Sequence, residues 1–366
     1  MHMPYYRPLT AVALLVMLTA CAAQASRPAA MPRLPPKVVA ESYVSLEVPG
    51  DELDSLATWR HADGTTWLIA TAKSSHRLAV FDADTGAHLR HFGEKGAALG
   101  QFKRPNGIAV LGNFLFVAER DNRRVQVFAL PEFRPLGSFG HDELRAPYGL
   151  WLNPASLPGN NGALDVYITD NFMEGAQFDV VPPLEQLNQR VRRYQLRFSI
   201  DGSFVAESLG SFGDTSEANA LRIVESIAGD PSRDRLLIAD EYQPQSTLRE
   251  YTLAGRATGR HIPENTFSFE AEGVALWSCR RGKGYWVAVD QLSPLTIFHF
   301  FDRATLTRAG SITGRTVAAT DGISLRIAPS KRFPNGALFA VDRDKSVAAF
   351  DLRAIVTALK LDRSCL

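Results

Sequence analysis

The sequence is poor in cysteine, in net charge and in long apolar runs. Only 3 of its 366 residues are cysteine, and no Cys/His spacing typical of a zinc site is present. Lys and Arg number 40 and Asp and Glu number 39, so there is no overall basic field, and nucleic acid is not expected as a partner. Hydrophobic residues make up 45% of the chain, enough for the core of one large domain or two ordinary ones.

The N-terminal segment is expected to be a targeting signal and not part of the fold. Its apolar run TAVALLVMLTA (residues 10–20) is too short for a comfortable membrane span. The run leads into LTAC (residues 18–21), which resembles a bacterial lipobox and implies a signal peptide over residues 1–20 and a lipid on Cys21. An ordinary signal peptide that contains a cysteine is the alternative. Two alanines and no Asp follow, which by resemblance favours an outer-membrane lipoprotein of the bacterial cell envelope.

Residues 21–40 are rich in Ala and Pro and are expected to be a tether, with the folded domain over residues 41–360. The membrane is then contacted only through the lipid, and the domain is expected to be a monomer. Two further cysteines remain, Cys279 and Cys365. An oxidising envelope allows a disulfide between them, but their separation in sequence says nothing about their distance.

The rest of the chain divides into about six similar units of roughly 35–60 residues, the period expected of propeller blades. Each unit holds four short strands rich in Val, Ile, Phe and Tyr, with turns such as RRGKG or FPNG between the first two. This pattern predicts an all-β fold, a six-bladed β-propeller of four-stranded antiparallel blades. The segment ESYVSLEV (41–48) is predicted to complete the last blade and close the ring. The alternative is a pair of β-sandwiches.

Acidic residues recur where the first strand of a unit begins and where the second strand ends. In a propeller blade these two points lie on the same face of the disc, so the side chains are expected to meet at one mouth of the channel. The first set is Asp54, Asn106, Tyr148, Glu225, Glu272 and Asp321. The second set is Lys73, Glu119, Arg120, Asp170, Asp240, Glu241, Asp290 and Asp342. Any single acid in these sets has an alternative role as a turn residue that accepts backbone hydrogen bonds.

Crowded carboxylates resist ionisation unless a cation compensates them. Calcium suits such a site, because it accepts six to eight oxygen ligands in flexible geometry. It can also polarise phosphate oxygens and activate water, while Lys or Arg holds the rest of an anionic ligand. The sequence therefore predicts Ca²⁺ at the channel mouth.

The second half of the chain resembles the β-propeller phytases, calcium-dependent hydrolases of myo-inositol hexakisphosphate. The resemblance covers about residues 220–352 and is weaker before them. It is carried by RIVESIAGDPSRDRLLIADE (222–241), FEAEGVALWSCRRGKGYWVAVDQ (269–291), TDGISL (320–325) and RFPNGALFAVD (332–342). It implies a calcium-dependent phosphomonoester hydrolase that acts on phytate or a related polyphosphate.

The resemblance also assigns roles to individual residues. Glu225 and Glu241 look like calcium-ligand glutamates, although Asp240 and Glu241 are open to exchange. Glu270 and Glu272 match the paired acids that hold calcium and position the attacking water. Asp321, in the TDG segment, matches a further ligand and catalytic residue at the phosphate site.

Two cations and one more acid complete the predicted site. Lys73 and Arg120 stand where the family has cations that hold phosphate. Asp54 is the metal ligand that remains where the family has two adjacent aspartates, because the segment here reads DSLATW.

The departures from the family keep two other functions open. The second unit, RPNGIAV followed by FVAERDNRRVQVF, looks like an NHL repeat. This NHL-like unit, together with the aspartate missing from the DSLATW segment, favours a second function. In that alternative, the protein is a non-catalytic envelope propeller that binds a protein or glycan at the channel mouth. A lactonase-like propeller would hold one central calcium through Asp54, Asn106, Glu225 and Asp321.

Overall fold

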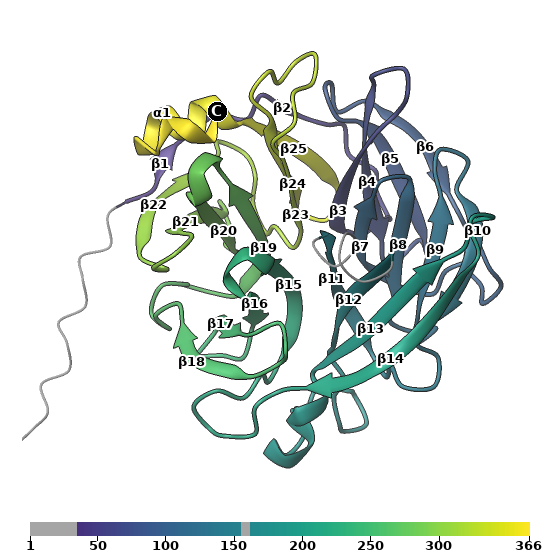
Figure 1. Cartoon of the computed structure of the whole chain (residues 1–366). Coiled ribbons are helices and arrows are strands. Elements are labelled where there is room, and N and C mark those ends of the chain that lie inside the picture. The colour runs from purple at the N-terminus through teal and green to yellow at the C-terminus, as the bar shows by residue number, and fades with distance from the viewer. Residues whose placement is uncertain (1–34, 155–161) are drawn as a thin grey trace, which may run out of the picture. The chain divides into compact units, whose positions relative to one another are not determined.

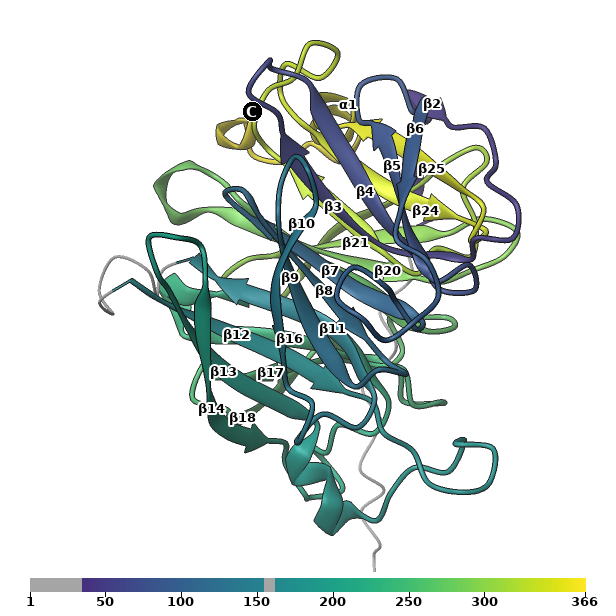
Figure 2. The same cartoon turned by 90° about the vertical axis from the view of Figure 1, so that its right-hand side faces the viewer.

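The computed structural model describes residues 35–154 and 162–366. The predicted signal peptide, Cys21 and most of the predicted tether lie outside the described residues. Pro35–Leu366 forms one compact unit, drawn along the channel in Figure 1 and turned by 90° in Figure 2. None of its described helices is long and apolar enough to cross a membrane.

Six antiparallel sheets are arranged around a central channel (Figure 1), which confirms the predicted six-bladed β-propeller over the β-sandwich alternative. The first blade contains β3 (Leu53–Arg60), β4 (Thr66–Ala72), β5 (Arg77–Asp82) and β6 (His88–Phe92). The second contains β7 (Pro105–Leu111), β8 (Phe114–Glu119), β9 (Arg124–Ala129) and β10 (Arg134–Phe139). The third contains β11 (Pro147–Asn153), β12 (Ala163–Asp170), β13 (Val191–Phe198) and β14 (Phe204–Phe212). A short 3₁₀ helix, η2 (Leu184–Gln189), lies in the long connection between β12 and β13.

The last three blades follow the same order. The fourth blade contains β15 (Val224–Asp230), β16 (Arg235–Asp240), β17 (Thr247–Tyr251) and β18 (Ala257–His261). The fifth contains β19 (Ala271–Ser278), β20 (Gly284–Asp290), β21 (Ile297–Asp302) and β22 (Arg308–Thr313). The sixth contains β23 (Ile323–Arg326), β24 (Ala337–Asp342) and β25 (Ser346–Asp351). The turns after β15 and β19 hold the 3₁₀ helices η3 (Pro231–Arg233) and η4 (Arg280–Gly282).

The core lies between the blades and not within any one of them. Six hydrophobic clusters each combine side chains of two neighbouring blades, and one of them joins the sixth blade to the first. The middle strands are therefore covered on both faces, and all six residues of β16 and of β24 are buried. The outermost strands β6, β14 and β18 are largely exposed.

The N-terminal segment closes the ring. Strand β2 (Tyr43–Val44) pairs antiparallel with β25, with Tyr43 opposite Ala349, which confirms the prediction for residues 41–48. Strand β1 (Lys37–Val38) pairs in parallel with β22 and adds a fifth strand to the fifth blade. The predicted tether is thus too long at its C-terminal end, because a two-residue edge strand leaves no pattern in an Ala/Pro-rich segment.

The chain ends in a helical segment that the sequence analysis did not predict. Helix α1 (Leu352–Leu359) buries Leu352, Ile355 and Val356, and Asp351 caps it by accepting the backbone N–H of Arg353 at 2.7 Å. A 3₁₀ helix, η5 (Arg363–Cys365), follows. Cys365 is buried and bonded to Cys279, so the packed domain extends past the predicted end at residue 360.

The Cys279–Cys365 disulfide closes a loop with a sequence separation of 86 residues. Cross-links of this kind stabilise a domain by about 2–4 kcal/mol, mainly by restricting the unfolded chain. We therefore expect the Cys279→Ala/Cys365→Ala variant to lose about that much unfolding free energy in urea titration. A reductant should lower the midpoint of the wild type and leave that of the variant unchanged; equal wild-type midpoints with and without reductant would contradict the assignment.

Candidate functional site

Side chains near the start of five innermost strands, and one just before the sixth, β23, form a ring around the channel. Close backbone contacts fix their order, since the N–H of Gly273 donates to the carbonyl of Asp321 at 3.0 Å. The hydroxyl of Thr169 donates to the carbonyl of Glu225 at 2.7 Å. A Cβ on Gly322 would lie 2.3 Å from the carbonyl oxygen of Asp54, so only glycine allows the sixth blade to approach the first this closely. The ring consists of Asp54, Asn106, Tyr148, Glu225, Glu272 and Asp321.

Three glutamates of the fourth and fifth blades form a cluster on this ring, hereafter the glutamate triad. Glu225 and Glu272 belong to the innermost strands β15 and β19, and Glu241 follows the end of β16. One carboxylate oxygen from each lies within 4.8 Å of the others. Glu272 and Glu241 are only 5% and 9% exposed, and Oε1 of Glu241 has no hydrogen-bond partner in the described part of the chain.

Burial and mutual repulsion keep the triad from ionising freely. Burial, and then the charges of Asp54 and Asp321, raise the pKa of Glu225 to about 8. Burial, followed by the neighbouring glutamates, raises the pKa of Glu241 well above its usual range. The pKa of Glu272 is raised in the same way. At neutral pH the triad must therefore share protons or bind a cation.

The opposite side of the ring carries its own cation. Nζ of Lys73 lies 3.0 Å from Oδ2 of Asp321, 3.3 Å from Oδ2 of Asp54 and 3.6 Å from Oε1 of Glu52. Burial alone would lower the pKa of Lys73, but the charges of Asp54 and Asp321 raise it well above its usual range. Burial still raises the pKa of Asp321, to about 7. Lys73 thus acts as a fixed counter-ion for Asp54 and Asp321, two of the six predicted metal ligands.

Neutral donors complete this side of the ring. The hydroxyl of Tyr148 and the amide of Asn106 each donate to Oδ2 of Asp54, both at 3.2 Å. Gln291 donates to Asp321. Sequence reasoning placed Tyr148 and Asn106 at the mouth but gave them no role in the phytase-like site, because it looked for carboxylates and cations. Gln291 had a usable signal, since it follows the end of β20 as Glu241 follows the end of β16.

Most acids of the second set are turn residues. The carboxylate of Asp170 accepts the backbone N–H of Ala146 at 2.6 Å, and that of Asp240 accepts the N–H of Ile223 at 3.0 Å. Glu119, Asp290 and Asp342 hold backbone N–H groups in the same way. Each acid thus ties the loop before an innermost strand to the end of the next strand. Of Asp240 and Glu241, Asp240 is thus engaged with the backbone, and Glu241 is the one that belongs to the triad.

Two predicted site residues lie apart from the carboxylate groups. The guanidinium of Arg120 is 40% exposed and pairs with Asp121 at 2.8 Å. Among the described residues its ion pairs and hydrogen bonds do not reach the triad. Glu270 is half-buried and outside the triad, although its charge helps to raise the pKa of Glu241. The side chain that follows a strand need not point into the channel, and spacing alone does not reveal this.

The glutamate triad fits a hard divalent cation. Its donors are all carboxylate oxygens, which calcium prefers. Glu241 is buried, and its Oε1 accepts no hydrogen bond from the described residues, so this oxygen is available as a metal ligand. Asp54 and Asp321 fit such an ion less well, since Lys73 already compensates them. Of the six predicted metal ligands, Glu225, Glu241 and Glu272 are the ones that would hold it.

The raised pKa values predict how stability depends on pH. A carboxylate whose folded pKa is raised binds its proton more tightly in the folded state than in the unfolded state, so stability falls as pH rises. With a chelator present, we expect the melting temperature to decline from about pH 5 to pH 8, through the pKa values of about 7 for Asp321 and about 8 for Glu225. Calcium should remove most of this decline. A flat profile in chelator would contradict the described protonation.

Fold and site together define this chain as a six-bladed β-propeller with a carboxylate-lined channel mouth. It matches no protein-family model, and no curated protein matches it. Among solved structures it is similar to the hydrazine synthase of Kuenenia stuttgartiensis, with 12% identity, a TM-score of 0.45, and 87% of this chain and 82% of that chain covered.

Two further solved structures are similar at the same level. One is a protein of unknown function from Bacteroides caccae (10% identity, TM-score 0.46, 75% and 81% of the two chains covered). The other is the Dos1 propeller (11% identity, TM-score 0.41, 85% and 72% covered). At such identities the likeness concerns the fold alone, and the function has to be argued from the site.

Proposed function

We propose that the protein is a calcium-dependent phosphomonoester hydrolase that acts at the channel mouth on phytate or a related polyphosphate. The observation that carries the proposal is the glutamate triad, three carboxylates gathered within 4.8 Å with an unused oxygen on Glu241. The fixed ammonium of Lys73 stands on the same ring and adds a positive group beside the acids. The resemblance of residues 220–352 to the β-propeller phytases supplies the substrate class.

The chain's own residues have distinct roles in this reaction. Calcium bound at the triad would supply positive charge for phosphate oxygens and acidify an attacking water. Glu272 orients that water. Lys73 offsets the charge that develops on the transferred phosphoryl group. Asp321, with a pKa of about 7, is able to hold or release a proton near neutral pH.

The reaction needs no covalent intermediate on the enzyme. The water oxygen forms a new bond to phosphorus as the bond between phosphorus and the ester oxygen breaks in line with it. The water proton passes to a carboxylate of the site, and the leaving alkoxide takes up a proton. The products are inorganic phosphate and an alcohol, so no redox partner or second substrate is required.

The direct test is phosphate release from calcium phytate by residues 35–366, with and without a chelator. We expect release that stops in chelator and returns when calcium is added back. Asp321→Asn should abolish release without lowering the melting temperature in calcium. Chelator-resistant release, or none at any calcium concentration, would count against the proposal.

A non-catalytic binding propeller is the second candidate, and one observation favours it. Both cations predicted to hold phosphate are engaged within the protein: Arg120 pairs with Asp121, and Lys73 pairs with Asp54 and Asp321. Under this alternative, calcium raises the melting temperature but no phosphate is released. The phosphate assay and a melting curve on the same sample therefore separate the two functions.

A further inference from the structure

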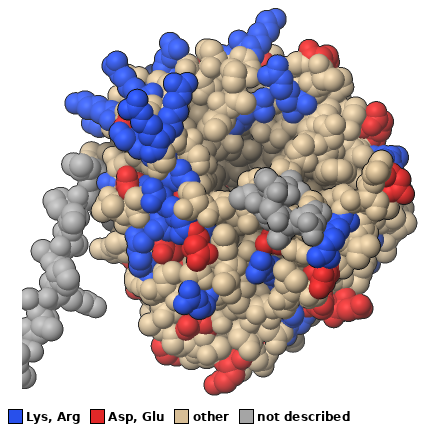
Figure 3. All heavy atoms as spheres, in the orientation of Figure 1, with Lys and Arg blue, Asp and Glu red and all other residues tan. Residues whose placement is uncertain are grey.

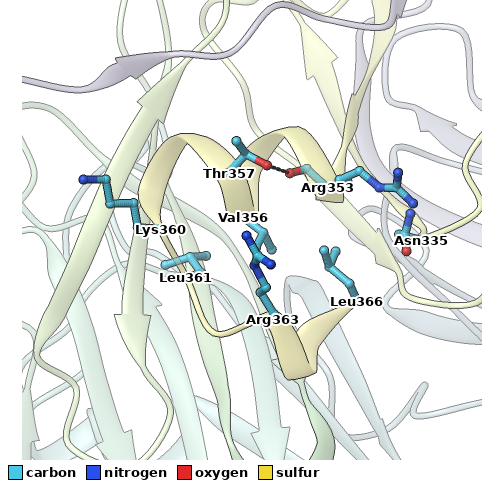
Figure 4. Close-up of a pocket in the computed structure, with 8 residues that line it drawn as sticks. All are labelled: Asn335, Arg353, Val356, Thr357, Lys360, Leu361, Arg363 and Leu366. Atoms are coloured by element: carbon cyan, nitrogen blue, oxygen red, sulfur yellow. Dashed lines mark hydrogen bonds between the residues drawn. The ribbon is translucent and has the colours of Figure 1, made fainter.

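A second charged surface lies around the C-terminal helix, away from the channel mouth. Helix α1 is amphipathic, with Ile355 and Val356 buried and Arg353 exposed, and the exposed Lys360 caps its C-terminus. A pocket of about 560 Å³ opens beside it (Figure 4). Its lining combines the cations Arg353, Lys360 and Arg363 with the apolar side chains of Val356, Leu361 and Leu366.

The disulfide brings more positive charge to this pocket. Cys365 is bonded to Cys279, which directly precedes Arg280, Arg281 and Lys283. The 3₁₀ helices η4 and η5 therefore lie against each other. In Figure 3, Lys and Arg atoms gather over the position that α1 occupies in Figure 1. We call this surface the basic patch; it consists of Arg280, Arg281, Lys283, Arg353, Lys360 and Arg363.

Little of this charge is compensated within the described part of the chain. Asp362 pairs with Lys283, and Asp351 is used as the N-cap of α1. With the Asn335 amide turned so that its oxygen faces Arg353, this neutral side chain accepts a hydrogen bond from the guanidinium at 2.8 Å. Arg280, Arg281, Lys360 and Arg363 form no ion pair with a described carboxylate. The patch is thus strongly positive on a chain whose net charge is only +1.

The topology places the basic patch on the face opposite the channel mouth. Strand β19 begins at the mouth with Glu272 and ends at Ser278, just before η4. Strand β25 likewise runs away from the mouth and ends where α1 begins. Strand β22 runs back toward the mouth, and β1 is parallel to it. The described chain therefore enters the propeller from the side of the basic patch.

We propose that the basic patch docks the propeller onto an anionic phospholipid surface, with the glutamate triad facing away from the membrane. Headgroup phosphates would lie on Arg353, Lys360 and Arg363, and the partly exposed side chain of Leu366 offers apolar contact to the adjoining glycerol carbons. The described chain enters the propeller on the side of the basic patch. The lipid that the lipobox predicts on Cys21 would therefore hold the basic patch toward the bilayer, which favours a membrane over a soluble anion. The proposal does not depend on hydrolysis at the mouth.

The test is co-sedimentation of residues 35–366 with vesicles. This unit contains all six blades, both closing strands and the disulfide, so it measures the patch without a lipid anchor. We expect binding to mixed phosphatidylglycerol–phosphatidylcholine vesicles at low salt and none to phosphatidylcholine alone. Each cation at an anionic surface contributes about a fivefold gain in affinity, so Arg353→Gln/Lys360→Gln/Arg363→Gln should bind on the order of a hundredfold more weakly.

A matched control removes the same charge from the opposite face. Lys95, Lys103 and Lys345 are exposed on loops at the channel mouth, and Lys95→Gln/Lys103→Gln/Lys345→Gln should bind vesicles like the wild type. Equal losses in both triple variants would reduce the effect to net charge and overturn the proposal. It would also be overturned by binding to phosphatidylcholine alone, or by complete release with inorganic phosphate at the lipid phosphate concentration. Melting temperatures verify that both variants are folded.

Discussion

Glu241→Gln should abolish calcium binding and, with it, calcium-dependent phosphate release. The substitution keeps the size of the side chain and removes the carboxylate whose fully buried Oε1 has no hydrogen-bond partner in the described part of the chain. Groups that merely hold a metal ligand in place cost about 10–100-fold in metal affinity when removed, and a direct ligand should cost at least the upper end of that range. Isothermal titration with calcium and the phosphate assay measure the two losses.

The same variant should behave in the opposite way without calcium. In chelator it removes one of three mutually repelling buried carboxylates, so its melting temperature at pH 8 should equal or exceed that of the wild type. Glu270→Gln is the matched control, because Glu270 lies outside the triad; it should keep most of the calcium affinity. If Glu270→Gln and Glu241→Gln weaken calcium equally, the three-residue assignment is wrong.

Lys73→Met should destabilise the domain by about 3–5 kcal/mol, the usual cost of removing one partner from a buried ion pair. The ammonium is 3.0 Å from Asp321 and 3.3 Å from Asp54, and the change leaves both carboxylates without their cation. Urea unfolding at pH 7 measures the loss. Phosphate release should fall as well, since no other described ion pair brings a cation to Asp54 or Asp321.

The double variant Lys73→Met/Asp54→Asn separates charge from packing. It removes one of the two carboxylates left without a partner, so it should recover a large part of the lost stability. Calcium should also stabilise Lys73→Met more than the wild type, because the ion then has uncompensated oxygens on both sides of the ring. A double variant no more stable than Lys73→Met would show that the ammonium acts through packing alone.

The architecture was predictable because each blade repeats the same alternation of apolar residues. Strands such as RLLIAD and ALFAVD end in an acid at the same register, and that repetition marked the blades. The sequence did not reveal elements that occur only once and are not repeated from blade to blade. Strand β1 is two residues long, and α1 is an eight-residue apolar segment that reads equally well as a strand.

The site was predictable as a set of positions but not as a set of partners. Glu225, Glu272, Asp54 and Asp321 share one register at the start of the innermost strands, and the structure brings them to one mouth. The register of a strand does not reveal which of these carboxylates pair with a cation. Lys73 pairs with Asp54 of the first blade and Asp321 of the last, which lie side by side only because the ring closes. Arg120 pairs with its sequence neighbour Asp121.

The closing segment also determines how the domain would respond to force. Residues 37–44 join two blades, through β1 on β22 and β2 on β25. Tension applied at the N-terminus would reach these short pairings before it reaches any core strand. The tension would load β1 along its own axis, so that its hydrogen bonds share the load instead of breaking one at a time. If these pairings yield, β25 is left with a free edge and the ring opens between the first and last blades.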